Sequence, residues 1–147
     1  MPTDIDLSTF HNDWIRLVDK AIFHYELLTE DERIWFNTQS LIHAVNDDGL
    51  ISFYYNYGAD HLSDTMTDLK ALGADEVVTI LQEINQLFPE GLPSTDIEER
   101  NDAMDTWDED EVNPLLDKLD EMFYHAEAKL ENQLITHIIS RNLNITS

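Results

Sequence analysis

Carboxylates are the groups that this sequence offers in a density that could support chemistry. Residues 96–121 contain twelve acids against two bases, Arg100 and Lys118, which gives a charge of −10 in 26 residues. The other 121 residues carry nineteen acids and six bases, so this segment is about three to four times denser in negative charge. Uniform solubilisation does not require such a concentration. We therefore take as candidate site residues the acids Asp96, Glu98, Glu99, Asp102, Asp105, Asp108, Glu109, Asp110, Glu111, Asp117, Asp120 and Glu121.

The spacing of these acids fits an array of phosphate-like groups on helices. Glu98, Asp102 and Asp105 are separated by four and three residues, which places neighbouring Cβ atoms about 5–6 Å apart on one helix face. On the C-terminal segment, one side away from the leucines carries Asp117, Asp120, Glu127 and Glu131. Duplex DNA carries one charge per about 1.7 Å of its axis. Carboxylates at these positions can therefore accept charge-assisted hydrogen bonds from lysine and arginine, as phosphates do.

Two other interpretations of the acidic segment stay open at this point. A solvated acidic face that confers solubility, as in a chaperone-like or salt-adapted protein, explains the charge without a partner. Clustered carboxylates also suit a metal-binding protein or a hydrolase. Against the first, like charges at helical spacing cost about 0.2–0.5 kcal/mol per pair, and a sequence selected for stability alone would intersperse lysines.

Specific catalytic and metal motifs are weak. The chain has no cysteine, so a disulfide, a thiolate zinc site and a cysteine nucleophile are excluded. An EF-hand frame on Asn46-Asp47-Asp48-Gly49 places Ala44 and Tyr55 where carboxylates are needed. His61, Asp64 and Asp68 have metal-ligand spacing on a helix, but we expect surface residues there rather than a metal site. We predict no enzymatic activity, no catalytic residue, no metal site and no cofactor.

The total charge limits the class of partner. The formal net charge is −23 and the isoelectric point is about 4.1. Such a field repels nucleic acid and anionic membranes and attracts basic proteins. The sequence has no run of about 18 apolar residues, and its N-terminus lacks the basic start and apolar run of a signal peptide. We expect a cytoplasmic protein that binds neither nucleic acid directly nor membrane.

Helical periodicity dominates the elements that position these acids. Apolar residues recur every three or four positions, and glycines and prolines separate the segments. Residues 50–55 form the one β-like run, for which we favour helix over strand. The expected helices cover residues 9–28, 29–46, 50–55, 60–72, 75–88, 95–107 and 114–142.

Helix ends and one apolar stripe are predicted in detail. Thr29 to Glu32 and Thr95 to Glu98 both have the form of a capping box, Gly73 is a C-terminal stop, and Asn113 precedes a proline at the first position of the last helix. That helix carries an apolar stripe of Leu115, Leu119, Met122, Ala126, Leu130, Leu134 and Ile138. The prediction is an all-α fold, a single compact domain over 1–147 with about six to eight helices and a long C-terminal helix.

The stretch from Tyr54 to Arg100 resembles the core of a bacterial family of helical domains formerly of unknown function. Its pieces are Asn56 and Gly58 after an aromatic run, Leu72-Gly73-Ala74 between two helices, Phe88-Pro89, and Arg100 after an acidic cap. The resemblance extends over about residues 33–140. Within the family, the chain is most similar to an acidic DNA mimic that binds a helix-turn-helix repressor as a homodimer and keeps it from its operator.

The resemblance implies a competitive mechanism. Helix-turn-helix dimers present two recognition helices about 34 Å apart, and a homodimer of this chain would offer two acidic faces. Because no acidic motif of the family is available to carry over, the twelve acids are assigned by local charge density alone. The sequence thus predicts a helical DNA-mimic domain that binds a helix-turn-helix DNA-binding protein. The alternative is an acidic metal-binding protein or a hydrolase that uses clustered carboxylates.

Overall fold

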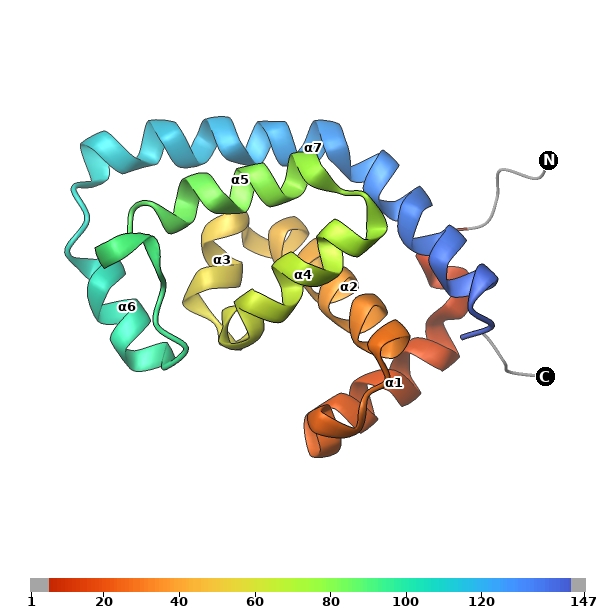
Figure 1. Cartoon of the computed structure of the whole chain (residues 1–147). Coiled ribbons are helices and arrows are strands. Elements are labelled where there is room, and N and C mark those ends of the chain that lie inside the picture. The colour runs from red at the N-terminus through yellow and green to blue at the C-terminus, as the bar shows by residue number, and fades with distance from the viewer. Residues whose placement is uncertain (1–5, 144–147) are drawn as a thin grey trace.

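A computed structural model of the chain describes residues 6–143, apart from the side chains at positions 57 and 58, and every regular element in that part is helical. Four short 3-10 helices accompany the α-helices, among them η3 (Tyr57–His61) between α3 and α4. The prediction of an all-α domain with a long C-terminal helix is confirmed. The α-helices, labelled in Figure 1, are α1 (His11–His24), α2 (Glu30–Asp48), α3 (Leu50–Tyr55), α4 (Leu62–Leu72), α5 (Asp75–Asn85), α6 (Ile97–Asp105) and α7 (Glu109–Ser140).

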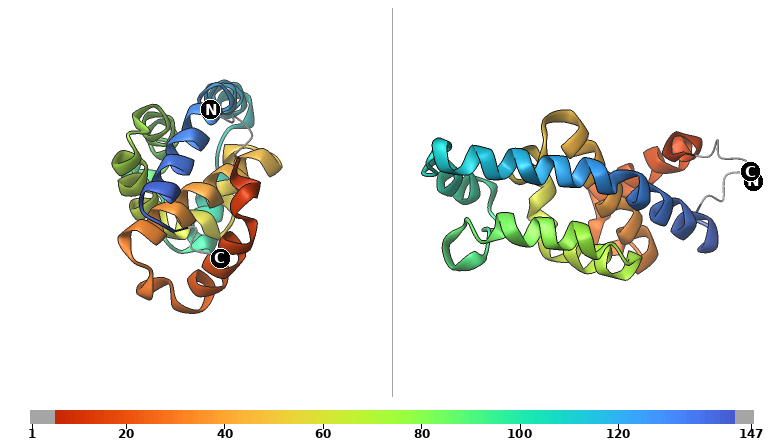
Figure 2. Two further views of the ribbon diagram at one scale, coloured as in Figure 1. Left: turned by 90° about the vertical axis from the view of Figure 1, so that its right-hand side faces the viewer. Right: turned by 90° about the horizontal axis from the view of Figure 1, so that it is seen from above.

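The longest helix, α7, extends along the whole molecule (Figures 1 and 2). It packs against α2 and α5, and α5 runs beside it in the opposite direction. The α2 helix also packs on α1, α3 and α4, so it occupies the centre of the bundle. At the N-terminal end of α7, α6 lies below it and packs on α3. The α1 helix lies toward the other end of the molecule.

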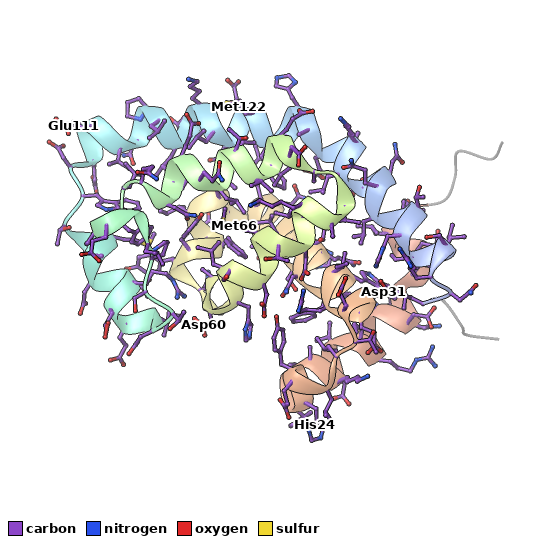
Figure 3. All side chains as sticks on the ribbon, viewed as in Figure 1. His24, Asp31, Asp60, Met66, Glu111 and Met122 are labelled. Atoms are coloured by element: carbon purple, nitrogen blue, oxygen red, sulfur yellow. The ribbon has the colours of Figure 1, made fainter. Side chains whose placement is uncertain are left out.

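The apolar stripe of α7 is shifted from the predicted one. Met122 is 39% exposed and stands on the outer side of the helix (Figure 3). Phe123 is fully buried in its place, because a four-residue step from Leu119 stays on the buried face. One turn before Leu119, the buried residue is Leu116 rather than the predicted Leu115. The lower positions of the predicted stripe, from Ala126 onward, are confirmed.

Two of the predicted helix signals are confirmed atom by atom. Thr29 Oγ1 accepts from the Glu32 amide at 3.1 Å, and Glu32 Oε1 accepts from the Thr29 amide at 3.0 Å, so the capping box forms. Gly73 ends α4 in the left-handed region at φ 82°, where a side chain would be strained. Residues 50–55 are helical, as favoured.

Two predicted helix starts are wrong. The α6 helix is capped by Asp96, whose carboxylate accepts from the Glu98 amide at 2.9 Å, and not by Thr95. The α7 helix starts at Glu109, capped by Asp108 through the Asp110 amide at 3.0 Å, so Pro114 lies inside the helix. Asp is among the strongest capping residues, and three acids in the first turn stabilise the helix by their attraction to the positive end of its dipole. These effects outweigh the loss of one amide donor at Pro114.

The short α3 helix depends on a contact with α7. Gly49 before it has φ 84°, and a Cβ there would meet Asp120 Oδ2 at 2.9 Å. Asp120 Oδ1 accepts the amide of Leu50, the first residue of α3, at 2.8 Å. A glycine is therefore required at position 49 both for its backbone angle and for the approach of the carboxylate. This contact fixes α3 against the N-terminal half of α7.

Candidate functional site

The twelve candidate acids lie on α6, on the turn after it and on the first half of α7. These two helices meet at one end of the molecule, where Figure 3 labels Glu111, far from His24 and Asp31. Eleven of the twelve side chains are exposed and Asp120 is half-buried. We call this part of the molecule the acidic end and define it by these twelve carboxylates. The structure thus brings together acids that the sequence spreads over 26 residues.

None of the twelve carboxylates forms an ion pair with a base among residues 6–143. The segment contains two bases, and Lys118 is exposed without a carboxylate in pairing distance in that part of the chain. The other, Arg100, points inward and is fully buried. The charge of the acidic end is therefore not neutralised by nearby side chains.

Arg100 holds α6 in place from the inside. Its guanidinium donates to three carbonyl oxygens, those of Tyr54 at 2.6 Å, Asn56 at 2.7 Å and Ser94 at 2.9 Å. It also pairs with Asp60 of η3 at 3.0 Å. Burial of a guanidinium is tolerated because these acceptors replace water. With Arg100 on the buried face, the acids of α6 face outward.

Five of the twelve acids have a partner within the fold. Asp96, Asp108 and Asp120 accept backbone amides at helix N-termini. Asp105 accepts the Tyr55 hydroxyl and Glu99 accepts the Ser94 hydroxyl, each at 3.3 Å. Part of the charge is therefore explained by capping and local hydrogen bonds.

Seven carboxylates are left that accept no hydrogen bond from any described residue. Asp110, Asp117 and Glu121 follow one line on the solvent side of α7, at steps of seven and four residues. This line is about 16 Å long at the helical rise of about 1.5 Å per residue. Glu98 and Asp102 form a shorter line on α6. The seven are Glu98, Asp102, Glu109, Asp110, Glu111, Asp117 and Glu121.

The predicted line of acids along α7 is mostly bound or half-buried within the fold. Asp120 is engaged with Leu50, and Glu127 accepts from Asn46 Nδ2 of α2 at 3.1 Å. Glu131 is half-buried, and burial together with the charge of Glu127 raises its pKa. Of the four acids in that predicted line, Asp117 alone is exposed, and the other three are half-buried because the line turns toward α2 and α3.

Two groups at the acidic end, Tyr55 and Asp120, have raised pKa values. The charge of Asp105 and its hydrogen bond raise the pKa of the Tyr55 hydroxyl. Burial raises the pKa of Asp120, and the charge of Asp117 adds to this, against the lowering effect of the Leu50 amide. Negative charge is the largest cause of the shift at Tyr55 and a smaller one, after burial, at Asp120.

A second group of carboxylates, on α4 and facing α2, is arranged differently. The fully buried Asp68 accepts from Arg33 at 2.7–3.1 Å and from Asn37 at 2.9 Å. Asn37 also donates to the Tyr25 hydroxyl at 3.0 Å, which donates to Asp64 at 2.9 Å. We call these five residues the Asp68 cluster. The expectation that Asp68 is a surface residue is wrong, since a salt bridge to Arg33 compensates its burial.

His61, the third residue with metal-ligand spacing, does not join a metal site. Its ring stacks on Tyr25 with centroids 3.7 Å apart. In the part of the chain that the structure describes, no three His, Asp or Glu side chains are arranged to hold a metal ion. Over the same residues, no helix is long and apolar enough to cross a membrane.

Comparison with known proteins gives one match. Residues 26–142 match the model of a family described as DMP19-like protein. No curated protein and no solved structure matches the chain. The matched region contains the acidic end and the Asp68 cluster apart from Tyr25, and it agrees with the resemblance to a helical family over about residues 33–140.

Proposed function

The chain belongs to the DMP19-like protein family, and from this premise we propose that it is a DNA mimic. In this proposal the acidic end binds a helix-turn-helix transcriptional repressor and competes with operator DNA for it. The function is one of binding, without catalysis, cofactor or metal. Because the operator of a bacterial repressor lies in the cytoplasm, the proposal also implies a cytoplasmic site of action.

One observation supports the proposal above the others. Seven exposed carboxylates that gather at one end of the molecule accept no hydrogen bond from the described part of the chain, and none of them forms an ion pair with a base there. Carboxylates in this state are free to accept from the lysines and arginines that bind phosphates in an operator complex. An acidic surface required only for solubility would not need to be concentrated at one end.

We further propose that the protein acts as a homodimer with α1 at the interface. Four apolar side chains of α1 and the turn after it are 52–69% exposed, namely Ile15, Ile22, Phe23 and Leu27. Exposed apolar side chains gathered in this way are typical of interaction surfaces. The helix carries two acids and two bases, so it is neutral in a molecule of charge −23. Two such molecules repel each other least where this face meets its copy, which leaves both acidic ends exposed.

Competition with DNA provides the test. The protein is added to a purified helix-turn-helix repressor bound to labelled operator, and release of the DNA is measured in a mobility-shift assay. A five-site variant removes charge at the acidic end: E98Q, D102N, D110N, D117N and E121Q. Its control removes the same charge from exposed acids elsewhere, outside α1: E30Q, D47N, D48N, D75N and E83Q.

We expect the acidic-end variant to lose about 10- to 100-fold in affinity for the repressor, since each exposed charge pair contributes roughly 0.2–1 kcal/mol. The control should lose far less. The complex should also weaken with salt less steeply than the repressor–DNA complex, because carboxylates hold fewer condensed counterions than duplex DNA. Equal losses in the two variants, or equal salt slopes, would contradict the proposal.

A further inference from the structure

A small groove opens at the acidic end, between α3, the end of α6 and the start of α7. Its volume is about 270 Å³, below the roughly 300–1,000 Å³ of sites for drug-sized ligands, so it fits a side chain better than a cofactor. Two acids, Asp105 and Glu109, belong to the groove. Its apolar and aromatic lining consists of Ile51, Tyr55, Met104, Trp107, Val112 and Leu116.

The walls of the groove are held by the core. Trp107 packs edge-on against the buried Phe88 with ring centroids 5.0 Å apart. Met104 and Leu116 are buried beneath the groove, whereas Tyr55 is 44% exposed. The Tyr55 hydroxyl donates to Asp105 at 3.3 Å. The groove therefore presents aromatic rings and carboxylates together to solvent on a fixed backbone.

We propose that this groove binds one arginine side chain of the basic protein partner. The inference rests on the proposed function and adds to it a residue-specific contact. Three features fit arginine: apolar walls for its methylene stem, aromatic rings for its guanidinium, and carboxylates that accept its N–H groups. The exposed Glu109 has no hydrogen-bond donor among the described residues, so its carboxylate is available.

Charge complementarity selects arginine over the other candidates. An apolar side chain would fill the groove but leave Asp105 and Glu109 without a cation. A lysine ammonium is a compact, strongly hydrated charge, and it stacks less well on aromatic rings than a planar guanidinium does. The groove thus distinguishes two side chains of equal charge, which the rest of the acidic end does not.

Three synthetic peptides test the inference. They share a sequence of flanking lysines and differ at one central position, which is arginine, lysine or leucine. Affinity for the full chain is measured by calorimetry at low salt, and the indole N–H resonance of Trp107, assigned with W107F, is followed by NMR. We expect the arginine peptide to bind about fivefold tighter or more than the lysine peptide and to shift the Trp107 resonance.

Two variants link the preference to the groove. V112F fills the space, and E109Q removes one carboxylate while leaving the lining intact. The matched control D117N removes the same charge from the line on α7. Either groove variant should reduce the arginine preference toward onefold, while D117N should weaken all three peptides alike. E109Q, as an exposed isosteric change, keeps the test informative even if V112F perturbs folding.

The outcomes separate the groove from the wider proposal. If arginine and lysine peptides bind equally, or if the leucine peptide binds tightest, the arginine site is overturned while charge-based binding by the acidic end stands. If neither basic peptide binds at low salt, the acidic end does not capture basic segments. The proposed function then fails, and the groove assignment fails with it.

Discussion

The acidic end and the Asp68 cluster use the same chemical group for opposite purposes. In the Asp68 cluster the buried carboxylate receives donors from Arg33 and Asn37, and it joins α2 to α4. At the acidic end seven carboxylates receive none from the described residues, and Arg100 is directed into the fold instead. In each region one arginine binds inside the fold, Arg33 at Asp68 and Arg100 at Asp60, and neither neutralises the seven exposed carboxylates.

Substitution of Arg100 should have the largest effect, because this base of the acidic segment binds inside the core. R100M should lower the free energy of unfolding by about 3–5 kcal/mol, since it leaves Asp60 and three carbonyl oxygens without their donor. It should also weaken repressor binding, because α6 loses its anchor although no carboxylate changes. Urea denaturation and the operator competition assay measure the two effects.

The matched control is K118M, at the other base of the same segment. Lys118 is exposed, so its removal should leave stability close to that of the unmodified chain and should strengthen capture of a basic partner slightly. If K118M destabilises the protein as much as R100M does, the assignment of Arg100 as a structural anchor is wrong.

An aspartate-to-asparagine substitution in each region should give the next largest difference in the free energy of unfolding. D68N should cost about 3 kcal/mol of unfolding free energy, at the low end for a broken buried pair, because Arg33 is 27% exposed and asparagine keeps one acceptor oxygen. D117N should leave stability unchanged or raise it slightly, since it removes a charge from a repulsive surface. Thermal unfolding of both variants in one buffer measures the contrast. Similar losses at the two positions would remove the distinction between the regions.

Much of the fold could be predicted from the sequence, because the signals for its helices and their ends are local. The capping box at Thr29, the left-handed stop at Gly73 and the 3.6-residue periodicity each depend on a few neighbouring residues. The start of α7 was misplaced because two local signals competed: Asn113-Pro114 resembles a helix start, but Asp108 caps the helix one and a half turns earlier. Local pattern alone does not rank such competitors.

Only the outline of the candidate site could be predicted from the sequence. Charge density identified the acidic end, and its exposure agrees with that prediction. It did not indicate that Asp120 is bound to Leu50 or that Arg100 is buried, because both depend on contacts between residues 44–70 positions apart. The Asp68 cluster was missed for the same reason, since Arg33 lies 35 residues from Asp68. No local signal marks either base, because Arg33 and Arg100 each have an acid at helical spacing in the sequence, Glu30 and Asp96.

The smallest expected effect concerns the pH dependence of stability, and it has opposite signs at Asp120 of the acidic end and at the paired Glu32 of α2. Burial raises the pKa of Asp120 above 3.8, whereas Glu32, despite burial that acts in the other direction, has a pKa below 4.5 because Lys20 and the Thr29 amide donate to it. A raised folded-state pKa means that stability falls as pH rises from 3.8 through the folded value. A lowered one means that Glu32 stabilises above 4.5 and that this contribution is lost as pH falls through its folded pKa.

Comparison of D120N and E32Q with the unmodified chain isolates these contributions from the titration of the other acids. Relative to the unmodified chain, D120N should gain stability as pH rises above 3.8, because asparagine keeps an acceptor for the Leu50 amide without the charge. E32Q should be less stable at neutral pH, and the deficit should disappear at low pH. Each difference should stay below about 1 kcal/mol, since both carboxylates are partly exposed to solvent. Melting temperatures measured from pH 3 to 7 give both curves, and curves that slope in the same direction would show that the charged form of Asp120 is stabilised by the fold, as that of Glu32 is.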